Sequence, residues 1–164
     1  MIFDILKLGN PELYETSTPI IREELPEAAE WTAHLHDTLM NYRARYGAGR
    51  AIAAPQIGYK KRMIYLYMDK PYVMINPVLT FPDEELYTLM DDCMSFPGLT
   101  VRVERHRRAK VQYRDLDWNE HEMALEGDWS ELVQHEYDHL DGILATMRAV
   151  DNKSLFLQQI KRDL

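Results

Sequence analysis

Two histidines and a glutamate late in the chain have the spacing of a metal site. His135, Glu136 and His139 form the pattern HExxH. Residues four apart lie on one face of a helix, so both imidazoles can reach one divalent ion while the glutamate reaches a water molecule on that ion. The pattern predicts a metal-dependent hydrolase, although such short matches also arise by chance as surface histidines beside an unrelated acid.

The class of hydrolase depends on the third protein ligand. Metzincin proteases supply a further downstream histidine, and the corresponding position here is Ala145. Other zinc proteases supply a downstream glutamate, yet residues 140–164 contain no Glu, His or Cys. An HExxH metallopeptidase therefore stays open only as an alternative that lacks its third ligand.

The single cysteine, Cys93, offers that third ligand from upstream. A lone cysteine is most often a small buried apolar residue. With His135 and His139 it completes a set of three protein donors, which leaves a tetrahedral ion one open position, as in catalytic sites. Thiolate and imidazole suit zinc by their softness, and also ferrous iron, cobalt or nickel.

A third segment, residues 49–58, reads GRAIAAPQIG. Small residues followed by proline and glutamine indicate backbone that closely approaches a bound molecule, with the amide of Gln56 able to donate and accept hydrogen bonds. The alternative is a tight connection between a helix and a strand, with the glutamine facing solvent.

In this order, the three segments resemble the peptide deformylase family, which removes the formyl group from new bacterial and organellar proteins. The family motifs GxGxAAPQ, EGCxS and QHExDH correspond to residues 49–56, 91–95 and 134–139. The resemblance spans nearly the whole chain. It implies metal-dependent hydrolysis of the N-formyl group, with release of formate, and an α+β fold whose antiparallel sheets wrap around a central helix that carries HExxH.

The resemblance also implies the metal centre and its acid/base. Cys93, His135 and His139 would bind one divalent ion, natively Fe²⁺, with Zn²⁺, Ni²⁺ or Co²⁺ able to replace it in a purified sample. Glu136 would act as general acid/base, a role that suits a carboxylate whose pKa is raised in an enclosed site.

Five further residues match family positions that contact the substrate. The side-chain amide of Gln56 and the backbone N–H of Met94 would hold the oxyanion that develops on the formyl oxygen. Arg50, Ala51 and Leu132 would contact the peptide.

Some positions depart from the family pattern. Asp92 and Ala51 replace glycines of the second and first motifs, and Thr100 stands where many members have an arginine. These changes leave open a deformylase-like peptide-binding protein with little or altered activity. In the family the first acid of the second motif pairs with a downstream arginine, and Asp91 with Arg105 would be that pair here.

The pocket for the first side chain of the substrate is apolar in the family, where it accepts methionine. Here Arg50, Asp128 and Glu131 bring charge to positions around it. Two interpretations stay open. In the first, Asp128 and Glu131 cap a helix while Arg50 faces solvent. In the second, the pocket prefers a polar or basic first residue, or ordinary formyl-methionyl peptides are poor substrates.

Two helices and a set of strands must position these side chains. Apolar residues three and four apart predict a helix over 26–46, and residues 128–140 return to that spacing, with a capping box of Asp128 and Glu131 at the start. Short apolar runs predict strands at 63–67, 72–75 and 110–113, and a last short helix is expected from Asn152 to the C-terminus.

Composition bounds the class of protein. With 27 acidic and 19 basic residues, a net charge of -8 argues against DNA or an anionic membrane as partner. One cysteine excludes an internal disulfide, and neither a signal peptide nor a membrane-spanning run is present. We therefore expect residues 1–164 to form one catalytic domain, a cytoplasmic monomer acting on N-formylated peptides or nascent chains, with the ribosome as a further expected partner.

Overall fold

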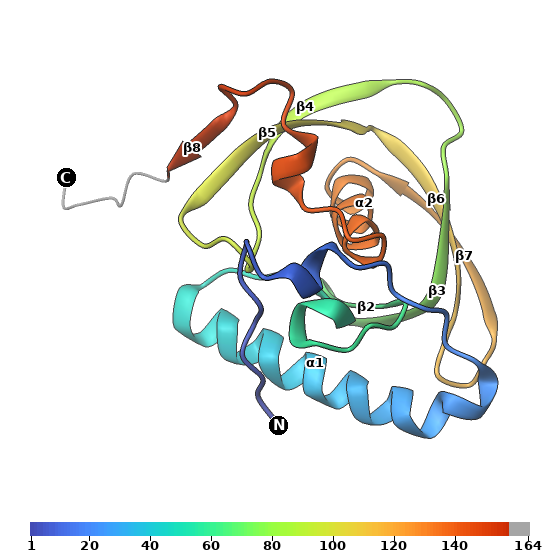
Figure 1. The fold of residues 1–164 in the computed structure, drawn as a ribbon. Helices are drawn as coiled ribbons and strands as arrows, with labels where there is room; N and C mark the ends of the chain where they lie inside the picture. Colours follow the sequence, from blue (N-terminus) through green and yellow to red (C-terminus); the bar gives the residue numbers. More distant parts are fainter. Residues whose placement is uncertain (158–164) are drawn as a thin grey trace.

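The computed structural model describes residues 1–157, which form two antiparallel sheets, two α-helices and short 3-10 helices (Figure 1). The five-stranded sheet has the order β1-β2-β3-β6-β7, and the three-stranded sheet has the order β4-β5-β8. This is the expected α+β class. The elements are η1 (Pro11–Tyr14), η2 (Arg22–Glu24), α1 (Leu25–Tyr46), β1 (Ala51–Ala53), η3 (Ala54–Ile57), β2 (Met63–Tyr67), β3 (Pro71–Thr80), β4 (Leu86–Asp91), β5 (Leu99–His106), β6 (Arg108–Arg114), β7 (Glu120–Glu126), α2 (Asp128–Leu140), η4 (Ala145–Arg148) and β8 (Leu155–Leu157).

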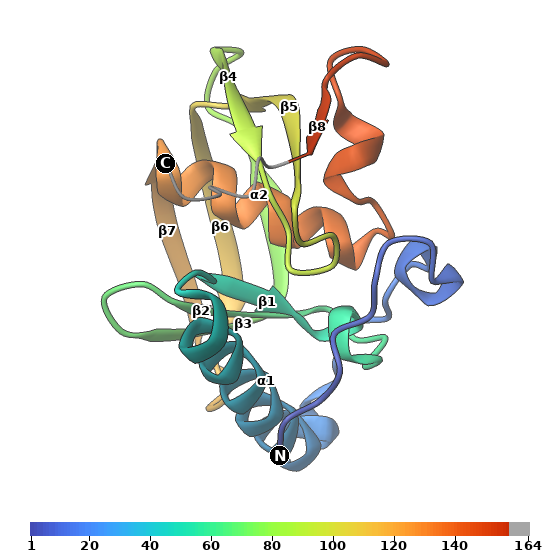
Figure 2. The same ribbon diagram turned by 90° about the vertical axis from the view of Figure 1, so that its left-hand side faces the viewer.

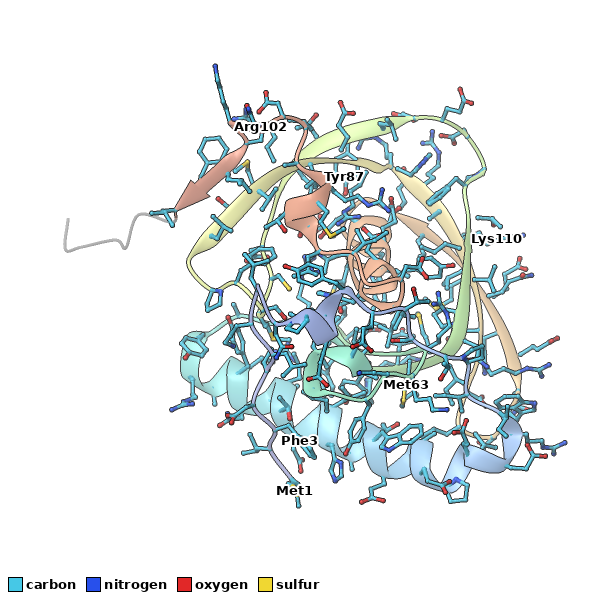
Figure 3. All side chains as sticks on the ribbon, viewed as in Figure 1. Met1, Phe3, Met63, Tyr87, Arg102 and Lys110 are labelled. Carbon is cyan, nitrogen blue, oxygen red and sulfur yellow. The ribbon has the colours of Figure 1, made fainter. Side chains whose placement is uncertain are left out.

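Helix α1 follows the predicted boundaries closely. A proline lies in its first turn, where a missing N–H costs nothing, and Gly47 ends it in the left-handed conformation with φ 65°. Leu35 and Leu39 are fully buried. They belong to the same core cluster as Met63 of β2. This cluster fills the space between α1 and the five-stranded sheet (Figure 3).

Helix α2 lies on the opposite side of the five-stranded sheet, between that sheet and the three-stranded one (Figure 2). Its apolar residues Leu132, Val133 and Leu140 are buried in a second core cluster that includes residues of β1, β2, β3, β6 and β7. At its C-terminal end, the N–H of Ser17 and the guanidinium of Arg62 donate to the carbonyl oxygen of Leu140, at 2.8 and 3.0 Å. A helix held on both sides presents its side chains in fixed directions.

A glycine closes the turn after α2. Gly142 has φ 71°, and a Cβ atom placed there would lie 2.4 Å from the carbonyl oxygen of Tyr14 in η1. The backbone of η1 can approach the end of α2 this closely only because residue 142 has no side chain.

The β4–β5 hairpin brings the second motif to α2. The two strands pair in register from Leu86 with His106 to Asp91 with Val101, so the chain from Asp92 onward forms the connection that crosses above α2. The hydroxyl of Tyr87 on β4 donates to the carbonyl oxygen of Gly127, just before α2 begins, at 2.9 Å (Figure 3).

Two local predictions were wrong. Gly127, not Asp128, is the N-cap of α2, and no side chain caps that end. The expected C-terminal helix is contradicted over Leu155–Leu157, which pair with β5 as strand β8, while its residues 158–164 lie outside the described part of the chain. Within residues 1–157, no helix is long and apolar enough to cross a membrane.

Candidate active site

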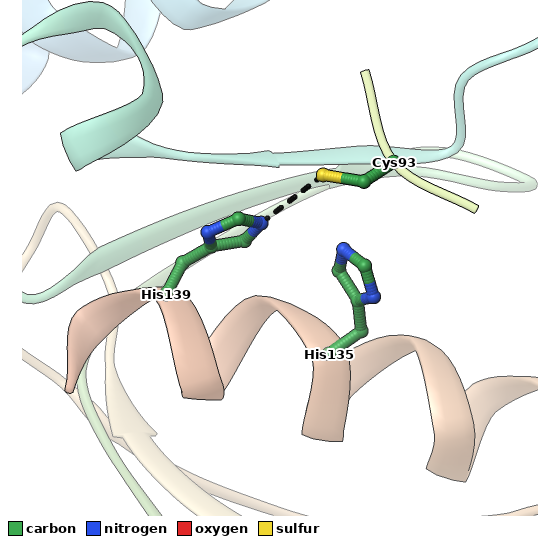
Figure 4. Close-up of side chains that lie close together, drawn as sticks. All are labelled: Cys93, His135 and His139. Atoms are coloured by element: carbon green, nitrogen blue, oxygen red, sulfur yellow. Dashed lines mark hydrogen bonds between the residues drawn. The ribbon is translucent and has the colours of Figure 1, made fainter. Parts of the chain in front are cut away.

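Three potential metal ligands converge above α2. Cys93 comes from the connection after β4, and His135 and His139 come from one face of α2 (Figure 4). One donor atom from each residue lies within 4.8 Å of the others, and Sγ of Cys93 is 3.3 Å from Nε2 of His139. One thiolate and two imidazoles are a soft donor set of the size that catalytic metal sites use. These three side chains could therefore hold a divalent ion.

A buried carboxylate orients the first histidine. Nδ1 of His135 lies 2.9 Å from Oδ2 of Asp91, which directs Nε2 toward the other two donors. Arg105 also donates to Oδ2 of Asp91 at 2.9 Å, so the predicted pair is present. Burial alone would raise the pKa of Asp91, but the attraction of His135 and Arg105 outweighs it and holds the pKa well below its usual range. Asp91 is thus ionised and fixes the ring.

Asp138 extends this network and was not expected from the sequence. Arg105 donates its other terminal nitrogen to Asp138 at 2.9 Å, and Arg148 makes two further hydrogen bonds to that carboxylate, both at 2.9 Å. The two arginines and two aspartates therefore connect β4, β5, α2 and η4 beneath the histidines. The available signal was a carboxylate between the two histidines on the apolar side of a helix, because a buried carboxylate requires a charged partner.

Glu136 is enclosed in the cavity beside the histidines. Its side chain is only 4% exposed, and its Oε2 has no hydrogen-bond partner among the described residues. Burial raises the pKa of Glu136 to about 7, because a carboxylate is costly to ionise away from water. A carboxyl group with this pKa can both accept and return a proton near neutral pH.

The first motif delivers Gln56 to the same place. Its side chain is buried, which rules out the solvent-facing interpretation, and Nε2 lies 3.5 Å from Sγ of Cys93 and 3.1 Å from Oγ of Ser95. The amide oxygen of Gln56 accepts from the N–H of Ala53 at 2.9 Å, which fixes the NH₂ group toward the site. No hydrogen bond within residues 1–157 uses the N–H of Met94.

The N-terminal segment supports both of these loops. The N–H of Leu6 donates to the carbonyl oxygen of Gln56, and the N–H of Leu8 to that of Ser95, both at 2.8 Å. Between them, Nζ of Lys7 donates to the carbonyl oxygen of Met94 at 3.2 Å. The N-terminal segment, which sequence patterns did not single out, thus connects the first and second motifs.

A cavity of about 450 Å³ opens beside these groups. Ala51 and Leu132 line it and are nearly fully buried, and Arg50 lines it from the start of the first motif. Nη2 of Arg50 donates to Oε1 of Glu131 at 2.7 Å. Capping by Glu131 is therefore contradicted, because its side chain turns into the cavity and pairs with Arg50. The Arg50 side chain is 39% exposed, so it meets Glu131 and also partly faces solvent. Asp128 is exposed and does not cap the helix.

The family model for polypeptide deformylase matches residues 2–154. This chain belongs to the polypeptide deformylase family. The peptide deformylase of Thermotoga maritima is 31% identical, over 99% of this chain and 96% of its own length. That of Maricaulis maris is 35% identical, over 87% of this chain and 82% of its own.

Solved deformylase structures share the fold. The Thermotoga maritima crystal structure aligns with a TM-score of 0.84 at 29% identity, covering 92% of this chain and 99% of that one. An Acinetobacter baumannii peptide deformylase with Met-Ala-Ser bound aligns with a TM-score of 0.82 at 28% identity, covering 90% and 98%. Family and fold thus assign this chain to the enzymes that hydrolyse N-formyl groups of nascent peptides.

Proposed function

We propose that this deformylase is an active, metal-dependent enzyme that hydrolyses the N-formyl group from the first residue of new polypeptides. The observation that carries the proposal is the convergence of Cys93, His135 and His139 beside Glu136, in a cavity open to a peptide. No downstream ligand of the peptidase kind accompanies the two histidines among the described residues.

Cys93, His135 and His139 would hold the ion on the central helix and the connection above it. Ferrous iron is proposed as the native ion, with Zn²⁺, Ni²⁺ or Co²⁺ able to occupy the same donors. A divalent ion there supplies Lewis acidity, which polarises the formyl carbonyl and makes water a better nucleophile.

Glu136 transfers the protons of the reaction. Its carboxylate removes a proton from the water that attacks the formyl carbon and then gives a proton to the departing amine nitrogen. The products are formate and a free N-terminus. The burial of the carboxyl group supports this role because it raises the pKa of Glu136 to about 7, and Oε2 has no hydrogen-bond partner among the described residues that would hold its proton.

Gln56 and Met94 stabilise the negative charge that develops on the formyl oxygen. The NH₂ group of Gln56 and the backbone N–H of Met94 would donate to it, and one such donor contributes about 3 kcal/mol in comparable sites. The fixed amide oxygen of Gln56 supports this assignment, since the donor cannot rotate away.

Arg50, Ala51 and Leu132 would contact the peptide in the cavity. Residues 1–164 would form one catalytic domain that works as a cytoplasmic monomer and meets nascent chains at the ribosome. The departures at Asp92, Ala51 and Thr100 motivate one other candidate, a protein that binds formylated peptides with little turnover.

Formate release from N-formyl peptides, measured under oxygen-free conditions with the iron-loaded chain, tests the proposal. We expect release by the wild type and a loss of at least about 100-fold in Glu136→Gln, since general acid/base catalysis contributes roughly that much. Metal content should be unchanged in Glu136→Gln. A metal-loaded wild type that binds formyl peptides without releasing formate would establish the binding protein instead.

A further inference from the structure

The mouth of the cavity is formed by Tyr42, Tyr46 and Asp92. The two tyrosines come from the last turns of α1, with ring centroids 4.6 Å apart, and Tyr46 is 62% exposed. Asp92 comes from the connection after β4 and is also exposed. A Cβ atom placed at Gly49 would lie 3.3 Å from the Tyr42 ring and 3.5 Å from the sulfur of Met94. The tyrosine pair thus lies directly beside the first and second motifs.

An extended substrate would run from the reacting groups to this mouth. Gln56, Ala51, residues 48–49 and Tyr46 line the cavity in reverse chain order from the reacting centre outward. Strand β1 ends the described five-stranded sheet, so a peptide can lie extended along its free edge. Side chains of an extended peptide alternate between the two faces of a sheet, and α1 and α2 cover opposite faces (Figure 2). If the first side chain points toward Leu132 of α2, the second points toward the side of α1.

The charges at the reacting centre nearly cancel when a divalent ion is bound. The thiolate of Cys93 offsets one positive charge of the ion, and Glu136 offsets the other when it is ionised. Asp91 is matched by Arg105, which it meets at 2.9 Å. The centre therefore adds little net charge to the cavity.

The side chains around the mouth carry an excess of negative charge. Arg50 pairs with Glu131 at 2.7 Å, and Asp92 and Asp128 attract the same guanidinium from beyond ion-pair distance. Asp92 forms no ion pair with any described residue, and it stands where the family has glycine. A substrate cation beside Asp92 would thus meet an exposed carboxylate that no ion pair within residues 1–157 occupies.

We propose that Asp92 and Tyr46 make this enzyme favour N-formyl-methionyl peptides whose second residue is lysine or arginine. The cation would lie over the exposed Tyr46 ring with its charge next to the Asp92 carboxylate, and its methylene chain would lie along Tyr42. The first residue remains methionine, so the preference acts among formylated chains that differ in the second residue. This inference rests on the proposed function and names the substrate class of the same site.

A matched set of substrates isolates the second side chain. Formyl-Met-Lys-Ala-Ser and formyl-Met-norleucine-Ala-Ser differ only in the terminal amine. For the metal-loaded wild type at low ionic strength, we expect KM to be at least about threefold lower for the lysine peptide, with similar kcat, because both contacts of the cation are exposed. The advantage should shrink toward one in 1 M salt, as expected for exposed charges.

Moving the lysine tests the alternation of side chains. Formyl-Met-Ala-Lys-Ser should show no such advantage over formyl-Met-Ala-norleucine-Ser. Equal KM values for lysine and norleucine at the second position, or an equal advantage at the third, would overturn the proposal.

Variants assign the preference to the mouth. Asp92→Asn keeps the size of the side chain and Tyr46→Leu removes the ring, and each should bring the ratio of the two KM values below about twofold. Asp117→Asn is the control, because it removes the same charge at an exposed position between β6 and β7 and should keep the wild-type ratio. Metal content is measured in each variant, since Asp92 adjoins Cys93. A wild-type ratio in either mouth variant would overturn the assignment.

Binding separates this inference from the proposed function. The formyl-free peptides Met-Lys-Ala-Ser and Met-norleucine-Ala-Ser can be titrated into the metal-loaded chain by calorimetry, and tighter binding of the lysine peptide is expected. Lysine selectivity in binding without any formate release would refute the proposed function and uphold the selectivity. Formate release with no preference in KM or binding would do the reverse.

Discussion

Outside the groups that take part in the reaction, substitution of Arg105 should lower the free energy of unfolding most. Its side chain is 3% exposed and donates to Asp91 and Asp138, both at 2.9 Å. Arg105→Met removes the charge while keeping much of the apolar volume, and it leaves two buried carboxylates short of a partner. Removing one partner of a buried ion pair costs about 3–5 kcal/mol.

Arg148→Met is the matched control. Arg148 also bonds Asp138, but its side chain is 46% exposed, so water can replace it. A pair of this exposure contributes at most about 1 kcal/mol. For a chain of this length, 1 kcal/mol shifts Tm by roughly 2–4 °C. We therefore expect Arg105→Met to lower Tm by roughly 6–20 °C and Arg148→Met by no more than about 4 °C.

The measurement is thermal and urea unfolding of metal-free protein near pH 7, followed by circular dichroism, so that metal binding does not mask the loss. The loss of stability in Arg105→Met should also depend on pH. Because the folded-state pKa of Asp91 lies below its unfolded value of about 4, its contribution is present above that pH and is lost as pH falls through the folded pKa. The difference between wild type and Arg105→Met should therefore shrink below about pH 4. Equal losses in the two variants, or a loss under about 1 kcal/mol in Arg105→Met, would refute the buried-network reasoning.

Three further predictions concern packing, metal and loop position. Gly142→Ala should lower the free energy of unfolding by at least about 2 kcal/mol, because of its positive φ and the contact with Tyr14, whereas Gly47→Ala, with open space around it, should cost about 1 kcal/mol in the same unfolding assay. Cys93→Ala should abolish stoichiometric metal binding, measured by elemental analysis, and retention of the metal would point to another ligand set. Lys7→Met should lower kcat roughly fivefold with metal content unchanged, and an unaltered kcat would show that the bond to Met94 does not position the loop.

The helices and the ligand set were within reach of sequence patterns. Both helices have apolar periodicity, and α1 also has a proline at its start and a glycine at its end. The spacing of His135 and His139 places them on one face of α2. Cys93 was selected because it is the one cysteine and the chain offers no downstream ligand. Residue types and spacing therefore suggested the ligand set, and the resemblance to the family added the other candidate site residues.

The features that sequence patterns missed depend on contacts between residues far apart in the sequence. Glu131 has the spacing of a capping residue, but its partner is Arg50, which lies 81 positions away in the sequence. Leu155–Leu157 could continue a helix by composition, yet pairing with β5 makes them a strand. Gln56 could equally have faced water, and only the arrangement of β1, η3 and the N-terminal segment buries it.

Cys93 carries the only thiol in the sequence, so its reactivity can report on the site without an engineered label. Every sulfhydryl reagent that modifies this protein must act at Cys93, the proposed metal ligand, because no second cysteine competes for it. The modification rate of one half-buried atom thus measures how often that position is vacant or uncovered, without any turnover assay. The rate of Cys93 modification can then report occupancy by metal, peptide or inhibitor in the wild-type sequence.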